Sequence, residues 1–405
     1  MDAIRKAIRW IELPEEQQSN RWSNEDIRPV PPERQTWGLL QYVELWILVN
    51  MNIATYQTGS AFIATGMTYW QAIIVIIIGN AMSAAFAVLN SVSGAQSHIG
   101  FPVVSRSVWG MWGAFFPIFN RILLSLVWFG VTAVNGGKMI YVMGRALMID
   151  LDSRVPNTLP TGIGITAGEF GGYVFFNLLC CLLIWLHPPQ LRPYMHSASM
   201  VTCIAILALL GWAMGTRSGW GDVVSAPGST NTTELAWSMC AGIMSVIGSI
   251  AAGILNQNDL TRFAKRPSHV TWSQGVSYLL SGNLIAIVGV LVTAATQDRY
   301  GKGTPLWDPS DLFRAIQDQH GSGGRTATFF LAFAMMLGQL SNNVVGNTLA
   351  GGLDIVAVFP KFANLRRGAY TIAVLSVLPN PWQQLASGST YVHSSWLANI
   401  LYAQS

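Results

Sequence analysis

The sequence predicts an all-α integral membrane protein with about nine complete transmembrane helices. Of its 405 residues, 51% are hydrophobic and only 10% are charged. A bilayer core of about 30 Å requires roughly 20 helical residues, and most of the apolar stretches come near this length. The period-two alternation of a membrane barrel is missing, so the stretches must be helices that satisfy their own backbone groups. The predicted spans are residues 38–64, 71–90, 122–143, 170–186, 198–215, 235–255, 276–296, 327–349 and 368–380.

The first and sixth spans are interrupted by polar residues or glycine. Asn50, Asn52 and Gln57 make the first span a candidate for local unwinding, which would offer carbonyl groups and half-helix ends to a substrate or ion. The sixth span is loosened by glycines and ends in polar residues 256–259, although close helix packing also explains glycines in a span. Because these spans are five apart, they suggest two five-helix repeats.

Charge placement orients the chain with a cytosolic amino terminus. Of the 23 Lys and Arg residues, 15 then lie on inside segments, Arg121 among them, in agreement with the positive-inside rule. Lys138 lies near the outer end of the third span, where snorkelling to the interface is expected. The net charge of +4 reflects this asymmetry and does not indicate a nucleic-acid partner. We expect a cytosolic segment over residues 1–36 and a transmembrane domain over residues 37–390.

The outer loop between the seventh and eighth spans contains a predicted short amphipathic helix. Asp308 can cap it, Pro309 suits its first position, and Asp311 is favourable in its first turn. Such a helix either covers the outer mouth of the protein or is an ordinary solvated loop helix.

Polar residues inside spans are costly without a partner or a water-filled cavity, so they mark candidate sites. In the eighth span, Asn343, Asn347, Gly351 and Asp354 follow one another at intervals of four, four and three, which places them on one helix face. A carboxamide offers the donor and acceptor that a planar ring amide needs. Asparagine also joins membrane helices to one another, so spacing alone leaves both roles open.

The third span carries Trp128, Thr132 and Asn135 on one face. An indole ring can stack on a flat heterocycle, or the residue can be interfacial or simply packed. No nucleophile and base, paired catalytic carboxylates or metal-ligand histidine cluster stands out in the spans. The sequence therefore predicts no enzyme, no cofactor and no metal site.

Five segments in register resemble the nucleobase-cation symporter-1 family, in its branch of fungal uracil, allantoin, uridine and thiamine permeases. The resemblance covers about residues 20–390. It rests on residues 26–37 (DIRPVPPERQTW), 128–131 (WFGV), 258–265 (NDLTRFAK), 366–368 (RRG) and 380–383 (NPWQ).

This resemblance implies a leucine-transporter-like fold, with ten core helices in two inverted five-helix repeats and two peripheral helices. It implies that the substrate ring stacks on Trp128 and is hydrogen-bonded by Asn347, with Gln57 in the first span as a further substrate-binding residue. Asn343 is a candidate substrate-binding residue because it lies in the same polar stripe as Asn347. Asp354 would act in coupling or gating. Asp259 and Arg262, in the matched segment after the sixth span, join that group.

Three departures from the family pattern qualify these expectations. Thr132, a further candidate substrate-binding residue, stands where relatives that bind uracil-like amides carry glutamine; its side chain is too short for the same bidentate contact, which puts uracil itself in doubt. Ser341 and Asn342 stand where sodium-coupled bacterial relatives place a Ser-Thr pair, which favours proton over sodium coupling. After residue 390 the family pattern does not continue, so residues 391–405 are expected to be an atypical tail and the transporter domain to be incomplete.

The sequence thus predicts a multi-pass plasma-membrane permease that imports a nucleobase, nucleoside, allantoin or thiamine-like heterocycle by proton symport. Its predicted partners are this small heterocycle and the lipid bilayer. The alternative is a truncated form that transports nothing and acts as a non-catalytic membrane protein.

Overall fold

The computed structural model describes residues 12, 28–186, 188–215, 232–388 and 390–391. Within these residues the regular secondary structure is helical, and the β-pairing is an isolated bridge between Trp37 and Ala264. Most of the predicted segment 1–36, and residues 392–405 of the predicted tail, lie outside the described residues.

Seven helical runs in the described part are long and apolar enough to cross a membrane, which confirms the second to eighth predicted spans. The first predicted span is divided into α2 (Leu39–Asn50) and α3 (Ile53–Ala64), and the ninth is the short α16 (Leu365–Leu375). The chain is therefore a multi-pass helical membrane protein. The seven runs are α4 (Tyr69–Ser97), α6 (Phe115–Leu147), α8 (Ala167–Trp185), α9 (Pro188–Gly215), α11 (Thr232–Leu255), α13 (Pro267–Tyr300), and a continuous run of α14 (Pro309–Asn342), the π-helical turn η4 (Asn343–Asn347) and α15 (Thr348–Val358).

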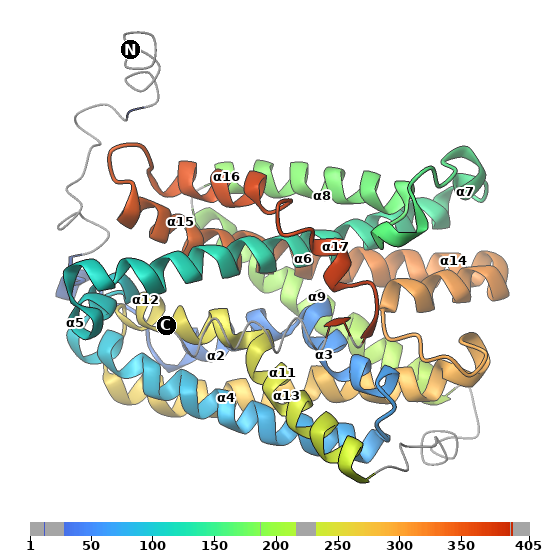
Figure 1. Cartoon of the computed structure of the whole chain (residues 1–405), viewed down its shortest axis with the longest axis horizontal. Coiled ribbons are helices and arrows are strands. Elements are labelled where there is room, and N and C mark those ends of the chain that lie inside the picture. The colour runs from blue at the N-terminus through green and yellow to red at the C-terminus, as the bar shows by residue number, and fades with distance from the viewer. Residues whose placement is uncertain (1–11, 13–27, 187, 216–231, 389, 392–405) are drawn as a thin grey trace.

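Short helices lie at both ends of the long ones. Figure 1 shows α7 (Leu151–Arg154) at the same end as the start of α14, while α5 (Phe101–Gly113) and α12 (Gln257–Thr261) lie at the opposite end. We name the first of these ends the outer end and the opposite one the inner end, after the orientation that the charge placement predicts. The last described helix, α17 (Pro381–Gln384), packs on α6.

The predicted unwinding of the first span is confirmed at Met51 and Asn52. The Asn52 side chain accepts a hydrogen bond from the backbone N–H of Thr55 at 3.0 Å, which starts α3 as a new helix. Asn50 donates to the Ser281 hydroxyl of α13 at 2.9 Å, so its amide is satisfied although it is buried. The sixth span is interrupted less: Asn256 separates α11 from α12 at the end of the span, but its backbone stays in the right-handed helical region.

The packing of the helices has the symmetry of an inverted repeat. The first span (α2 and α3) packs on the seventh (α13), and the sixth (α11) packs on the second (α4). Similarly, the third (α6) packs on the fourth (α8), and the eighth (α15) packs on the ninth (α16). If each span is exchanged for the one five positions away, the first–seventh contact becomes the sixth–second contact, and the third–fourth contact becomes the eighth–ninth contact. The second–seventh and third–eighth contacts are unchanged by this exchange. The two predicted repeats therefore follow from the packing.

Two glycines allow α3 and α13 to approach closely. A Cβ atom on Gly59 would lie 1.9 Å from the backbone oxygen of Ala286, and one on Gly289 would lie 2.2 Å from that of Tyr56. Close backbone contact of this kind is typical of small residues between membrane helices. It holds the second half of the divided first span against the seventh.

The predicted outer loop helix is confirmed as the first part of α14. Asp308 caps it by accepting a hydrogen bond from the Ser310 N–H at 2.9 Å, and Pro309 is its first residue. Leu312 and Phe313 are fully buried beneath it. The helix axis breaks at Gly321, whose φ of 56° favours glycine, and the eighth span follows.

Candidate functional site

The first two residues of the predicted polar stripe, Asn343 and Asn347, lie in the π-helical turn η4, and Gly351 and Asp354 follow in α15. Asn347 donates through Nδ2 to the Asn343 side-chain oxygen at 2.9 Å and to the Thr132 hydroxyl of α6 at 3.4 Å. Asn343 in turn donates to the backbone oxygen of Phe129 at 3.3 Å. A π-helical turn frequently marks a functional site. The structure thus brings together Thr132, Asn343 and Asn347, three of the predicted substrate-binding residues.

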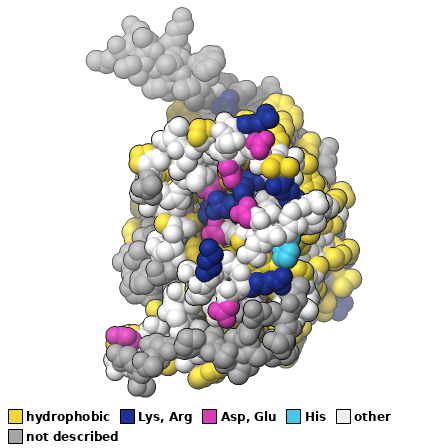
Figure 2. Space-filling view, turned by 90° about the vertical axis from the view of Figure 1, so that its right-hand side faces the viewer, with side chains coloured by type: hydrophobic (Ala, Val, Ile, Leu, Met, Phe, Trp, Pro, Cys, Tyr) yellow, Lys and Arg dark blue, Asp and Glu magenta, His cyan; other side chains and the backbone are white. Residues whose placement is uncertain are grey.

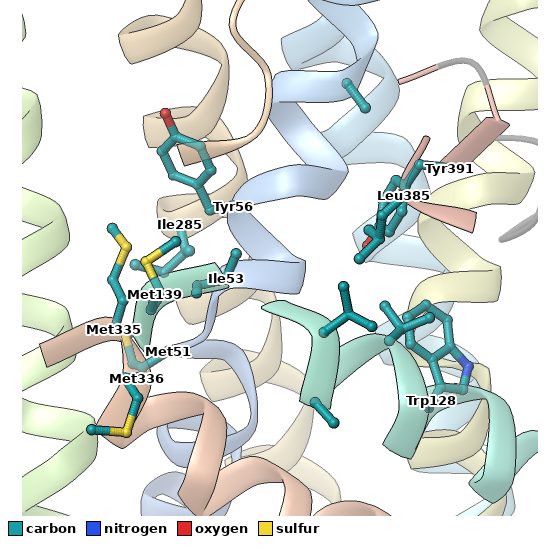
Figure 3. Packing of buried hydrophobic residues seen from close by; sticks show 14 of the residues in the cluster. Met51, Ile53, Tyr56, Trp128, Met139, Ile285, Met335, Met336, Leu385 and Tyr391 are labelled. Atoms are coloured by element: carbon teal, nitrogen blue, oxygen red, sulfur yellow. The ribbon is translucent and has the colours of Figure 1, made fainter. Parts of the chain in front are cut away.

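Trp128 lies one turn before Thr132 on the same face of α6. Its side chain is 9% exposed, and its indole N–H has no hydrogen-bond partner among the described residues. Figure 3 shows the ring below Leu385 and Tyr391, which follow α17. An indole that is buried usually pairs its N–H, so this group remains available to a ligand.

Gln57 is held differently from the other predicted binding residues. Its Nε2 donates to the Asn135 side-chain oxygen at 3.0 Å, and its Oε1 accepts from Asn135 Nδ2 at 2.8 Å. Both side chains are buried. In this conformation the reciprocal amide pair joins α3 to α6 and leaves Gln57 satisfied within the protein.

The predicted coupling residues Ser341 and Asn342 lie at the end of α14. The Ser341 hydroxyl is buried without a hydrogen-bond partner in the described part of the chain. The Asn342 side-chain oxygen lies along its own helix, 3.0 Å from where a Cβ of Gly346 would be. One turn earlier, Gly338 packs against the carboxyl end of α2. A Cβ atom added to Gly338 would lie 3.0 Å from the Met51 backbone oxygen.

A buried ionic cluster closes the inner end of the molecule. Arg121 of α6 donates through Nε to Asp354 Oδ2 at 2.6 Å and through a terminal nitrogen to Asp259 Oδ2 at 2.6 Å. Its other terminal nitrogen pairs with Asp354 Oδ1. Asp259 also accepts from the N–H of Phe101 at 3.0 Å, and the Arg121 guanidinium lies 4.0 Å from the centre of the Phe101 ring. We call Arg121, Asp259 and Asp354 the inner cluster.

The prediction that Arg121 is an inside-loop charge was wrong. It is fully buried in α6 and ties this helix to α12 and α15. Sequence reasoning missed it as a site residue because it was counted for topology alone. The available signal was spacing, because Arg121 lies two turns before Trp128 on the same helix face.

Arg262 lies beside the inner cluster. Its Nε donates to the backbone oxygen of Asp259 at 3.2 Å, and its guanidinium lies 5.1 Å from the centre of the Phe263 ring. It is only 8% exposed. The two charged residues predicted from segment 258–265 are thus both at the inner end.

A second buried ion pair closes the outer end. Lys138 of α6 donates to Asp308 Oδ2 at 2.7 Å, and the two residues are 7% and 1% exposed. The prediction that Lys138 snorkels was wrong, because the cap of the outer loop helix provides an anionic partner. Arg314 of that helix pairs with Asp311 and lies 3.5 Å from Glu169 of α8. We call Lys138 and Asp308 the outer pair; Figure 2 shows charged side chains gathered on this end of the molecule.

The candidate site lies between the two ionic contacts along one helix. Arg121 and Lys138 are both on α6, and their 17-residue separation corresponds to about 25 Å at 1.5 Å per residue. Trp128 and Thr132 lie between them. Both contacts are formed at once, so the polar centre lies between two sets of ion pairs that join α6 to other helices.

Comparison with known proteins identifies the family. A family model described as permease for cytosine and purines, uracil, thiamine and allantoin matches residues 29–404, so the expectation that the family pattern stops at residue 390 was wrong. The chain is 32% identical to an uncharacterised permease of Schizosaccharomyces pombe over 92% of its own length. It is 31% identical to the uridine permease of Saccharomyces cerevisiae over 94% of its own length. It spans 62% and 60% of the lengths of these relatives.

Solved structures show the same fold. The inward-facing conformation of Mhp1 superposes with a TM-score of 0.73 at 19% identity and covers 93% of this chain and 76% of that one. Mhp1 in a closed conformation with bromovinylhydantoin bound gives 0.70 at 19% identity, covering 94% and 80%. These similarities confirm the predicted leucine-transporter-like fold. The family and the relatives are permeases, in agreement with the prediction of a transporter rather than an enzyme. The chain belongs to the nucleobase-cation symporter-1 family, the permeases for cytosine and purines, uracil, thiamine and allantoin.

Proposed function

We propose that the protein is a plasma-membrane transporter that imports a small heterocycle, such as a nucleobase, nucleoside, allantoin or thiamine-like compound, by proton symport, with its amino terminus in the cytosol. The observation that carries this proposal is the polar centre of Trp128, Thr132 and Asn347, which lies between ionic contacts at both ends of α6. Family membership supports the same class of substrate.

In the proposed site the substrate ring is held by its face and by its edge. Trp128 stacks on the ring, which adds about 0.5–1.5 kcal/mol beyond the burial of area. The Asn347 amide nitrogen donates hydrogen bonds to Thr132 and Asn343. These bonds fix the orientation of the Asn347 side chain and therefore the direction of its oxygen. That oxygen can accept a hydrogen bond from a ring N–H.

Alternating access then requires the two ends to open in turn. Opening to the outside separates the outer pair, because Lys138 and Asp308 join α6 to the loop helix. Opening to the inside separates the inner cluster, because Arg121 joins α6 to α12 and α15. The break in the first span at Met51 and Asn52 provides helix ends within the membrane about which such movements can occur.

Proton coupling is favoured over sodium coupling by the residues at the end of α14. Ser341 offers a single hydroxyl there, while the Asn342 side chain lies along its own helix. The carboxylates of Asp259 and Asp354, both nearly or fully buried, are candidate proton carriers. One proton moving across 100 mV provides about 2.3 kcal/mol, which corresponds to roughly fifty-fold accumulation at 1.4 kcal/mol per tenfold.

A radiolabelled uptake panel with site variants tests the proposal. We expect Trp128→Ala and Asn347→Ala to abolish high-affinity uptake of the transported heterocycle without lowering surface expression. Trp109→Ala, which removes a 44% exposed tryptophan of α5, provides the matched control and should transport normally. Near-normal apparent affinity in either site variant would refute this assignment.

A further inference from the structure

Gln339 of α14 is a buried carboxamide whose two polar atoms are both unpaired. Its side chain is 0% exposed, and neither Nε2 nor Oε1 has a hydrogen-bond partner among the described residues. A buried polar group without a partner destabilises a protein by about 1–3 kcal/mol. Buried side-chain amides are therefore nearly always bonded. A group that is unsatisfied at both atoms points to a partner that the described residues do not supply.

The neighbours of Gln339 on its helix face show where it points. Asn343, four residues later, reaches the backbone oxygen of Phe129 on α6. Met335, four residues earlier, is drawn near Met51 and Met139 in Figure 3, and Met51 lies against α14, because a Cβ on Gly338 would be 3.0 Å from its backbone oxygen. Residues four apart lie on one face of a helix. Gln339 therefore faces α6 between Phe129 and Met139, beside the break of the first span.

The other amides on this wall of the site already have partners. Gln57 and Asn135 bond each other at both amide atoms. Asn347 uses its nitrogen on Asn343 and on Thr132. Thr132, which lies one turn beyond Trp128, contributes one hydroxyl. Gln339 thus offers an unused donor and an unused acceptor at the depth of Thr132 and Asn135.

We propose that Gln339 determines substrate specificity by binding an edge of the ring that presents an N–H beside a C=O, as lactams and ureides do. The Gln339 nitrogen donates to the ring carbonyl, and its oxygen accepts from the ring N–H. This assignment rests on the proposed function. It places the bidentate contact on the eighth span, where it compensates for the short side chain of Thr132 on the third.

The test measures binding of an N–H ring against its N-methyl derivative. The probe is the best-bound compound among uracil, uridine and allantoin, with its ring N-methyl derivative, on the purified full chain. A site that hydrogen-bonds a ring N–H strongly rejects analogues lacking it. We expect the wild type to prefer the N–H ring by at least about tenfold, which equals about 1.4 kcal/mol. Gln339→Met should weaken binding of the N–H ring by a similar factor and abolish the preference.

Thermal stability without ligand separates recognition from a structural role. Gln339→Met removes an unpaired amide, so the melting temperature should be unchanged or higher. The matched control is Gln274→Met in α13, another fully buried glutamine, in which only one of the two polar atoms is unpaired: its oxygen accepts from Trp46 Nε1 at 3.1 Å, while its Nε2 has no partner among the described residues. That variant should melt lower and keep the wild-type preference for the N–H ring.

Two results would overturn the assignment of Gln339 while leaving the proposed function intact. One is an unaltered preference for the N–H ring in Gln339→Met. The other is a fall in melting temperature as large as that of Gln274→Met, because it would show that the Gln339 amide is satisfied inside the protein. If the wild type binds none of the three rings, the assignment of Gln339 to lactam and ureide edges fails as well, while a thiamine-like substrate stays within the proposed function.

Discussion

Replacing Asp308 by Asn is expected to destabilise the protein strongly by leaving Lys138 buried without its counter-ion. Lys138 is 7% exposed and lies 2.7 Å from the Asp308 carboxylate. Breaking a buried ion pair from one side typically costs about 3–5 kcal/mol. Asn caps a helix about as well as Asp, so the contact with the Ser310 N–H is retained and the loss reports the ion pair.

The double variant isolates the energy of this pair. Lys138→Met together with Asp308→Asn removes both charges, and replacing a buried pair with uncharged groups is often neutral or stabilising. We therefore expect the double variant to recover most of the stability lost in Asp308→Asn. Asp318→Asn is the matched control on the same outer face, because Asp318 pairs with Arg145 at 3.0 Å but is 63% exposed as a side chain. Such a pair contributes only about 0–1 kcal/mol.

Thermal unfolding of the four purified proteins measures these differences. The double variant should also favour the outward-open form, since the loop helix is no longer joined to α6 by charge. If Asp308→Asn proves no less stable than Asp318→Asn, or if the double variant is no more stable than Asp308→Asn, Lys138 and Asp308 do not form the buried pair that the reasoning requires.

Three further predictions concern coupling, the inner end and the packing of the first span. Replacing sodium by choline should leave uptake unchanged and a protonophore should reduce it, whereas a strict sodium requirement would contradict the interpretation of Asn342. Asp354→Asn should abolish transport and lower thermal stability by about 3 kcal/mol, because the fully buried Arg121 loses one of its two carboxylates; normal uptake would exclude the inner cluster from gating. Gly59→Ala should destabilise by about 1–3 kcal/mol, since its Cβ would lie 1.9 Å from the Ala286 backbone oxygen. Gly171→Ala in α8, with nothing within 4 Å, should melt no lower than the wild type.

Hydropathy and local polarity predicted the elements of this fold closely. The break at Met51 and Asn52 was predictable because Asn50 and Asn52 interrupt an apolar run, and an asparagine can cap the helix that follows it. Asp308 and Pro309 likewise predicted the start of the outer loop helix. The π-helical turn at Asn343–Asn347 was not predictable, because the four-residue spacing of its asparagines is that of an ordinary helix.

The charged groups in α6 show what the sequence left open. An arginine or lysine near the end of a span can lie in a loop, snorkel to the interface or form a buried pair. The partners of Arg121 are more than a hundred residues away in the chain, and so is the partner of Lys138. No periodicity within α6 could identify them.

By itself, the sequence determined that this is a helical multi-pass membrane protein of one recognisable family, with a tryptophan and a stripe of asparagines inside the bilayer. These properties depend on residues near one another in the chain, through hydropathy, helix periodicity and capping. Only the tertiary structure decided which polar groups are already satisfied and which remain available. Gln57 is paired and Gln339 is not, because hydrogen bonding between spans depends on how the helices lie in three dimensions.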